Sequence, residues 1–143
     1  MPVPWAHRPA KQLPAKHLRE RICIVDDDEG VADSLKLLLE TFGYDAQSYN
    51  SAGDFLADDR QGAANCLIID QHMPDVDGLD VIDHLQKQGS QVPTILISGR
   101  LDTHIKERAA SLGITSVLEK PFAGDRLIAL IRTALLERNS CSP

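Results

Sequence analysis

The sequence has no apolar run near the roughly 18 residues that a membrane-spanning helix needs, and only 4% of its 143 residues are aromatic. Its three cysteines form no Cys-x-x-Cys pair, so the sequence indicates neither a disulfide framework nor a thiolate zinc site. Cys23 and Cys66 lie inside apolar runs and are predicted to be small core residues. The first residues lack the continuous apolar stretch of a secretory signal. We therefore expect a cytoplasmic protein that makes no membrane contact.

Basic charge is scarce outside the N-terminal segment. The first 21 residues hold five of the 15 basic residues and one of the 21 acidic residues. The remainder carries 10 basic and 20 acidic residues, a balance of −10. Because phosphate contacts dominate affinity for nucleic acids, this chain is not expected to bind DNA or RNA directly.

The length and composition predict one folded domain. Hydrophobic residues make up 43% of the chain and charged residues 25%, which is ordinary for a soluble domain of this size. Proline recurs through the first 16 residues. We expect a flexible tail over residues 1–19, a domain over residues 20–138 and a short C-terminal tail over residues 139–143.

Short apolar runs alternate with segments of helical spacing. In the first such segment Val31, Leu35, Leu38 and Phe42 are spaced to share one helix face. Continuous apolar strands that alternate with amphipathic helices are typical of a parallel sheet with helices on both faces, a doubly wound α/β fold. The five predicted strands lie at residues 22–25, 44–48, 66–69, 94–97 and 117–118.

Polar residues follow four of these strands where each one ends. Asp26 and Asp27 follow the first strand, Asp70 the third, Ser98 the fourth and Lys120 the fifth. A helix cap or a surface charge would explain any one of these positions, but not all of them together. Ligands of open parallel sheets bind beyond the carboxyl ends of the strands, so these side chains are predicted to converge there.

Three converging carboxylates need a cation. At a separation of about 5 Å, each pair repels by roughly 3 kcal/mol at an effective dielectric constant near 20. Oxygen ligands without histidine or cysteine select a hard divalent ion, and Mg²⁺ is predicted. A metal ion, a lysine and a hydroxyl around a carboxylate are the parts of a phosphoryl-transfer site, in which Asp70 would form an acyl phosphate.

Four segments together resemble the receiver domain of bacterial two-component response regulators, and the resemblance covers about residues 20–138. It implies a five-stranded parallel sheet with the flavodoxin-like strand order 2-1-3-4-5. It also implies a signalling module that catalyses only its own phosphorylation and dephosphorylation, and is therefore not a conventional enzyme. The four segments are Val25-Asp26-Asp27-Asp28, Asp70-Gln71-His72-Met73-Pro74-Asp75-Val76-Asp77-Gly78, Ile97-Ser98-Gly99 and Lys120-Pro121-Phe122.

The resemblance also implies which residues transfer phosphate. Asp70 would accept a phosphoryl group from a phosphohistidine on a histidine kinase or a histidine phosphotransfer protein. Asp26 and Asp27 would hold Mg²⁺ with Asp70. His72 would add its backbone carbonyl to the metal ligands and leave its imidazole free.

The other matched residues would sense the phosphoryl group. Ser98 matches the switch hydroxyl that moves to bond a phosphoryl oxygen, and Gly99 beside it would leave room for the phosphate. Lys120 would pair with the phosphoryl charge, and the peptide bond before Pro121 would be cis.

One position departs from the family pattern, and two others invite a prediction. Val117 stands where many receivers have an aromatic residue that turns inward with the switch hydroxyl. This weakens the expectation of a homodimer through the face of the fourth helix, fifth strand and fifth helix. His72 and Arg100, each two residues beyond Asp70 and Ser98, are predicted to flank the path of the attacking water and to tune phosphoryl lifetime.

Three smaller predictions concern loops. Asp28 is expected to cap the helix that follows it. Asp75 and Asp77 are expected to be turn residues, and Gly78 is expected to need a positive φ.

Two other functional classes remain open from the sequence. Read as an Asp-x-Asp motif, Asp26 to Asp28 would give a small phosphatase of the haloacid dehalogenase type with Asp26 as nucleophile. That family expects a glycine where this chain has Glu29. A receiver-shaped binding module that is never phosphorylated is the other alternative. The middle and C-terminal segments resemble receivers that precede a helix-turn-helix DNA-binding domain, so the chain is either a stand-alone receiver or part of a longer regulator.

Overall fold

The computed structural model describes residues 19–141, apart from the side chains of residues 61 and 138–141. Residues 1–18 of the predicted 1–19 tail and the last two residues lie outside the described part. Strands and helices alternate along the chain: β1 (Arg21–Val25), α2 (Glu29–Thr41), β2 (Asp45–Tyr49), α3 (Ala52–Ala57), the 3₁₀ helix η2 (Asp59–Ala63), β3 (Cys66–Asp70), α4 (Gly78–Lys87), β4 (Thr94–Ser98), α5 (Thr103–Ser111), β5 (Ser116–Glu119) and α6 (Gly124–Cys141). Helix α6 thus extends into residues 139–141, where the sequence predicted a tail.

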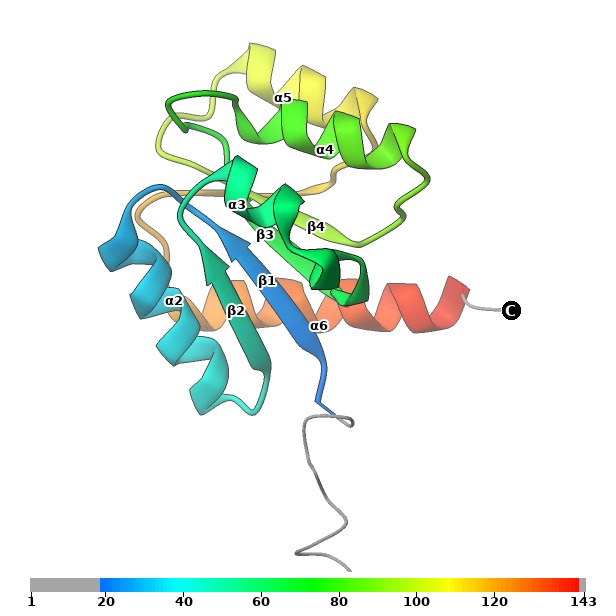
Figure 1. The fold of residues 1–143 in the computed structure, drawn as a ribbon. Coiled ribbons are helices and arrows are strands. Elements are labelled where there is room, and N and C mark those ends of the chain that lie inside the picture. Colours follow the sequence, from blue (N-terminus) through cyan, green and yellow to red (C-terminus); the bar gives the residue numbers. More distant parts are fainter. Residues whose placement is uncertain (1–18, 142–143) are drawn as a thin grey trace, which may run out of the picture.

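The five strands form one parallel sheet in the order β2-β1-β3-β4-β5, which confirms the predicted fold (Figure 1). The first strand lies between β2 and β3, and its residue Ile24 is paired with Ser48 on β2 and with Ile68 on β3. Because all strands run the same way, their carboxyl ends share one edge of the sheet. The residues predicted to form the site all end strands or follow them at this edge.

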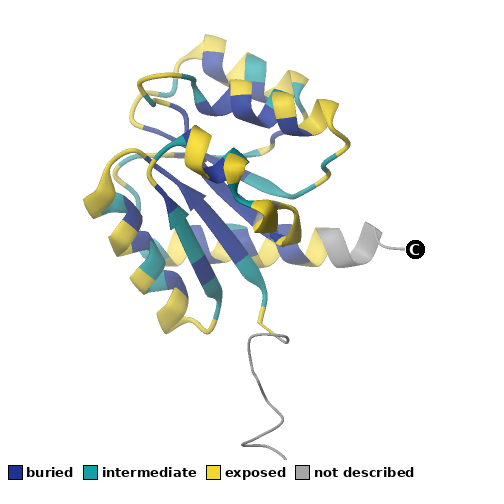
Figure 2. Ribbon diagram, in the orientation of Figure 1, coloured by how far each residue is buried: buried dark blue, intermediate teal, exposed yellow. Residues whose placement is uncertain are grey.

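Helices cover both faces of the sheet, and each face has its own core (Figure 2). Alternate residues of β1 point to opposite faces: Ile22 and Ile24 pack against α2 and α6, whereas Cys23 and Val25 pack on the side of α3, α4 and α5. We call these the α2/α6 layer and the α3/α4/α5 layer. Cys23 and Cys66 are buried core residues, as predicted.

The buried stripe of α2 differs from the predicted one. Its buried residues are Ala32, Leu35 and Leu39, whereas Phe42 is 46% exposed. Phe42 is the C-cap of the helix, so it lies where the chain turns away from the sheet. Its ring packs instead under the guanidinium of Arg132 on α6, 5.9 Å from the ring centroid.

The caps of the helices are set locally by the sequence. Asp28 accepts a hydrogen bond from the Val31 N–H at 3.1 Å, which confirms it as the N-cap of α2.

Across the described residues 19–141, no helix combines the length and apolarity that crossing a membrane requires.

Candidate functional site

Buried polar side chains gather at the carboxyl edge of the sheet. Among the described residues, the buried polar side chains are those of Asp26, Asp70, Gln71 and Ser98. Each one ends a strand or directly follows one. Burying polar groups is unfavourable unless they are paired, so their concentration here indicates a built site.

The three predicted carboxylates do converge. Asp26, Asp27 and Asp70 each offer an oxygen, and these oxygens lie within 4.8 Å of one another. Asp26 and Asp70 are buried, at 1% and 5% exposure, and Asp27 is exposed. The backbone N–H of Asp28 donates to Asp26 Oδ1 at 2.9 Å and so fixes its carboxylate. The cluster is therefore preformed by the turn after β1 and by the end of β3.

The electrostatics of this cluster favour a cation. Burial raises the pKa of Asp70, and the neighbouring charge of Asp26 raises it further. Repulsion between such carboxylates is about 3 kcal/mol per pair at an effective dielectric constant near 20. The donor set is made only of carboxylate oxygens, which suits a hard divalent ion. The residues present therefore fit the predicted metal site.

Lys120 supplies a positive charge next to the cluster. Its Nζ lies 3.2 Å from Asp26 Oδ2 and 3.5 Å from Asp70 Oδ2. Burial disfavours its charged form, yet the two carboxylates raise the pKa of Lys120 above its usual value. Its backbone N–H donates to the Ser98 carbonyl at 2.9 Å, and the Lys120–Pro121 peptide bond is cis, as the resemblance implied.

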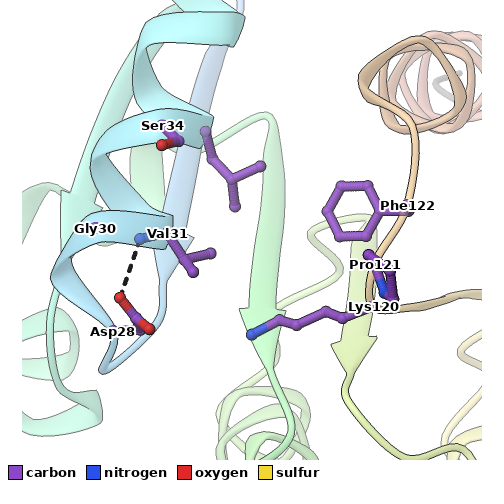
Figure 3. Close-up of a pocket in the computed structure, with 8 residues that line it drawn as sticks. Asp28, Gly30, Val31, Ser34, Lys120, Pro121 and Phe122 are labelled. Atoms are coloured by element: carbon purple, nitrogen blue, oxygen red, sulfur yellow. Dashed lines mark hydrogen bonds between the residues drawn. The ribbon is translucent and has the colours of Figure 1, made fainter.

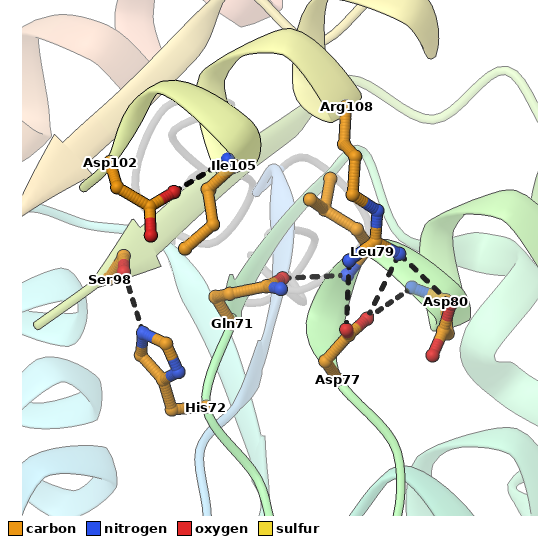
Figure 4. A network of polar contacts seen from close by, with 9 residues as sticks. All are labelled: Gln71, His72, Asp77, Leu79, Asp80, Ser98, Asp102, Ile105 and Arg108. Carbon is orange, nitrogen blue, oxygen red and sulfur yellow. Dashed lines mark hydrogen bonds and ion pairs between the residues drawn. The ribbon is translucent and has the colours of Figure 1, made fainter. Parts of the chain in front are cut away.

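Ser98 is fully buried, at 0% exposure, and its hydroxyl is engaged (Figure 4). Ser98 Oγ donates to the Arg100 carbonyl at 2.7 Å and accepts from the Arg100 N–H at 3.1 Å. It also lies 3.0 Å from His72 Nε2. The expectation that the His72 imidazole is free is therefore wrong. The loop after β3 brings the ring across to the end of β4, a path that spacing along the chain does not reveal.

The other predicted residues around Ser98 are placed as follows. An added Cβ on Gly99 would meet no heavy atom within 4 Å, so the space beside it is open. The Arg100 side chain is exposed. Val117 is half-buried and packs against the core of the α3/α4/α5 layer. Pro121 is exposed.

Gln71 was missed by the sequence analysis. Its side chain is 3% exposed and accepts a hydrogen bond from the Leu79 N–H at 2.9 Å. Its backbone N–H donates to the Ile97 carbonyl at 2.7 Å. Gln71 therefore ties the loop after Asp70 both to β4 and to the start of α4. The available signal was a neutral polar residue directly after a buried strand.

Gly78 is required for a reason other than the predicted one. The positive-φ glycines are Gly43, Gly89 and Gly113. Gly78 starts α4, and a Cβ there would lie 2.6 Å from the backbone carbonyl oxygen of Asp70. Glycine is needed because α4 begins so close to the backbone of Asp70 that a side chain would clash with it.

A second polar cluster joins α4 to α5 (Figure 4). Asp77 caps α4 by accepting from the Asp80 N–H at 2.8 Å, so it is more than a turn residue. Arg108 on α5 reaches back to Asp77 Oδ2 at 2.9 Å and to Asp80 Oδ1 at 3.0 Å. Burial disfavours the Asp77 carboxylate, but hydrogen bonds from Arg108 hold its pKa below the usual value. Sequence spacing alone gave no sign of Arg108.

A groove opens beside the cluster between the start of α2 and the loop after β5 (Figure 3). Its volume is about 520 Å³. Apolar side chains line much of it, and Lys120 contributes the cationic group. The lining residues are Asp28, Gly30, Val31, Ser34, Leu35, Lys120, Pro121 and Phe122.

Comparisons with known proteins agree with this geometry. The response regulator receiver domain family model matches residues 22–132. The response regulator protein TodT of Pseudomonas putida is 37% identical over 142 residues, which cover 94% of this chain and 63% of TodT. The transcriptional regulatory protein FixJ of Bradyrhizobium diazoefficiens is 35% identical over 115 residues, covering 80% of this chain and 56% of FixJ. The chain thus spans less than two thirds of the length of these relatives.

Solved structures show the same fold. A CheY-like response regulator receiver domain protein from Methanospirillum hungatei superposes with a TM-score of 0.81 at 27% identity, covering 87% of this chain and 99% of that one. The crystal structure of FixJ-N gives a TM-score of 0.73 at 30% identity, covering 82% of this chain and 94% of that one. The family match spans most of the described residues, including the carboxylate cluster, Ser98 and Lys120. This chain belongs to the response regulator receiver domain family.

Proposed function

We propose that this domain accepts a phosphoryl group on Asp70 from a phosphohistidine, in a Mg²⁺-dependent reaction, and signals through a change around Ser98. The observation that carries the proposal is the position of Asp70. Its carboxylate lies 3.5 Å from the Lys120 ammonium and shares a 4.8 Å cluster with Asp26 and Asp27. A nucleophilic carboxylate, a fixed cation and a metal site are the components that phosphoryl transfer needs.

The residues of the site would share the work of the transfer. A carboxylate oxygen of Asp70 attacks the phosphorus, and the P–N bond to the donor imidazole breaks as the new O–P bond forms. The departing imidazole nitrogen takes a proton from water. Lys120 then exchanges part of its contact with Asp70 for the phosphoryl oxygens, whose negative charge it neutralises. In hydrolysis, water attacks the phosphorus, inorganic phosphate leaves and the Asp70 carboxylate is restored.

The metal site would be formed by Asp26, Asp27 and Asp70, together with the backbone carbonyl of His72. A bound Mg²⁺ supplies charge neutralisation at the phosphoryl oxygens. Asp26 is already oriented by the Asp28 N–H, so little reorganisation of the carboxylates is needed.

The switch would begin at Ser98. Its hydroxyl must give up its bond to the Arg100 carbonyl before it can donate to a phosphoryl oxygen. The open space at Gly99 leaves room for the phosphate. His72 and Arg100 would flank the path of the attacking water and tune the lifetime of the acyl phosphate. Val117, in place of an aromatic residue, would alter how the change reaches the face of α5, β5 and α6, through which a homodimer would form.

The donor would approach along the groove beside Lys120. Val31, Leu35 and Phe122 give it an apolar wall next to the phosphoryl site. A helix of a histidine kinase or histidine phosphotransfer protein could bury its apolar face there.

We propose that the domain works in the cytoplasm, either as a stand-alone receiver or as the input of a longer regulator. One relative of greater length bears the name transcriptional regulatory protein.

The test is phosphorylation by a small donor with a P–N bond, phosphoramidate, followed by intact-mass spectrometry. The wild type should gain one phosphoryl group with Mg²⁺ and none with a chelator. Asp70→Asn should gain none, whereas Asp75→Asn, which removes an exposed carboxylate from the same loop, should behave as wild type. Phosphorylation that persists in Asp70→Asn but disappears in Asp26→Asn would favour the phosphatase reading. A wild type that no donor modifies would favour a binding module that is never phosphorylated.

A further inference from the structure

The Ser98 hydroxyl uses all of its hydrogen-bonding capacity in this structure. A serine hydroxyl has one proton to donate and two lone pairs that accept. The proton goes to the Arg100 carbonyl at 2.7 Å, and one lone pair accepts from the Arg100 N–H at 3.1 Å. The 3.0 Å contact with His72 must therefore be a bond that the ring donates from Nε2–H. The tautomer with a proton on Nε2 is therefore the one that satisfies all three contacts.

The three bonds come from two different loops. Both Arg100 groups belong to the loop that directly follows Ser98, so these two bonds form a local turn. His72 belongs to the loop after β3, two residues beyond Asp70, and its contact is the one that spans from the phosphoryl site to the loop after β4. In addition, the N–H of Leu101, which lies in the loop after β4, donates to the Glu119 carboxylate at 3.2 Å. The loop after β4 is thus held from both sides.

We propose that the His72 imidazole is a positioning residue that holds Ser98 in its unphosphorylated arrangement. In this arrangement Ser98 has no proton left for a phosphoryl oxygen on Asp70. Turning the hydroxyl toward Asp70 breaks both the Arg100 carbonyl bond and the His72 bond. Removing the imidazole therefore favours the turned arrangement. This inference rests on the proposed function, because the turned state matters only if Asp70 is phosphorylated.

The size of the effect follows from one hydrogen bond. Loss of the His72 bond should shift the equilibrium toward the turned state by about 2- to 10-fold, which corresponds to about 0.4–1.4 kcal/mol. The affinity for beryllofluoride, which mimics a phosphoryl group on aspartate, should rise by the same factor, because it binds the turned state.

The first measurement uses the metal-free protein and needs no phosphorylation. Amide NMR shifts of residues 99–102 are recorded for wild type and for His72→Ala. The Arg100 amide of His72→Ala should move toward its position in the beryllofluoride complex. His72→Gln, whose side chain amide can still donate to Ser98, should lie closer to wild type. His84→Ala, which removes an exposed histidine from α4, is the matched control and should leave these shifts unchanged.

The second measurement is the beryllofluoride affinity of the same variants and of Ser98→Ala. The gain from His72→Ala should vanish when Ser98 is already alanine, since no hydroxyl remains to be held. Unchanged Arg100 shifts and unchanged affinity in a folded His72→Ala would overturn the inference, as would an equal gain in the Ser98→Ala background. A protein that is not phosphorylated at Asp70 at all would instead overturn the proposed function, while the metal-free shifts would still report the His72 contact.

Discussion

Helices α6 and α5, which cover opposite faces of the sheet, are held to it in different ways. Helix α6 buries five apolar residues, Leu127, Ile128, Ile131, Ala134 and Leu135. Helix α5, on the other face, buries only Ile105 and Ala109. Much of what fixes α5 is polar: the Asp102 cap on the Ile105 N–H, the pairing of Arg108 with Asp77, and the bonds around Ser98 at the end of the preceding strand.

The difference between these two helices indicates which of them can respond to phosphorylation. Apolar packing is non-directional, and a charged phosphoryl group forms no favourable contact that could replace it. Hydrogen bonds to Ser98 can be exchanged for bonds to a phosphoryl oxygen, so the polar contacts have an alternative arrangement. We therefore expect α5 and the loop before it to move on phosphorylation and α6 to stay in place.

The largest effect is expected from disrupting the apolar packing of α6. Leu127→Ala removes a side chain that is 0% exposed and leaves a cavity against the sheet. The free energy of unfolding should fall by about 2–5 kcal/mol, as measured by urea denaturation. At a temperature where the variant is still folded, its rate of phosphorylation should match wild type. A strong loss of rate in the folded variant would show that the packing of α6 and the phosphoryl site are not separable.

A smaller loss of stability, from a change at the start of α4, should come with a direct effect on the site. Gly78→Ala places a Cβ 2.6 Å from the Asp70 carbonyl oxygen, so the backbone at Asp70 or the start of α4 must shift. We expect a loss of about 1–3 kcal/mol and a slower phosphorylation by phosphoramidate. Gly53→Ala in α3 is the matched control, because its Cβ meets only the Ser51 hydroxyl oxygen at 3.9 Å. The account would be contradicted if both alanine variants behaved alike.

Arg108→Gln tests the ion pairs that join α5 to α4. The side chains of Arg108 and Asp77 are 32% and 31% exposed, so the expected loss of stability is about 0.5–1 kcal/mol. Its pH dependence has a definite sign. The folded-state pKa of Asp77 lies below its unfolded value, so the contribution is complete above a pH of about 4 and is lost as the pH falls through the folded pKa. Urea denaturation at several pH values should show the wild type and the variant converging in acid. A difference that stays constant would assign the loss to packing.

The smallest effect is expected from Tyr49→Phe, which removes a polar contact far from Ser98 in sequence. The Tyr49 hydroxyl donates to Asp58 at 2.7 Å. Burial, followed by this hydrogen bond, raises the pKa of Tyr49 to about 12. The stabilisation is present below the unfolded value of about 10 and is lost as the pH rises through the folded value. The variant should show a urea midpoint only slightly below wild type and an unchanged phosphorylation rate. Ultraviolet titration should show the Tyr49 phenol ionising at a pH of about 12.

The sequence predicted the parts of the site that depend on strand ends. Asp26, Asp70 and Lys120 could be placed together because buried apolar runs mark the strands and parallel strands end at one edge. The fold followed from the same alternation. In each case a short, regular element fixes where the side chain lies.

The sequence did not predict contacts that depend on the course of a loop. The His72 ring reaches Ser98, and Arg108 reaches Asp77, across gaps of 26 and 31 residues. Such pairs have no periodic signature. Gly78 was predicted correctly as a special position but for the wrong reason, because close approach of two backbones and a positive φ both require glycine.

The most direct test of the account locates the phosphoryl group itself. The protein is phosphorylated with phosphoramidate and Mg²⁺ and then treated with borohydride, which reduces an acyl phosphate of aspartate to homoserine. Peptide mass spectrometry then identifies the converted residue. The account predicts homoserine at position 70 and unmodified aspartate at positions 26 and 27. Conversion at position 26, or no conversion at any aspartate of a protein that has gained phosphate, would contradict it.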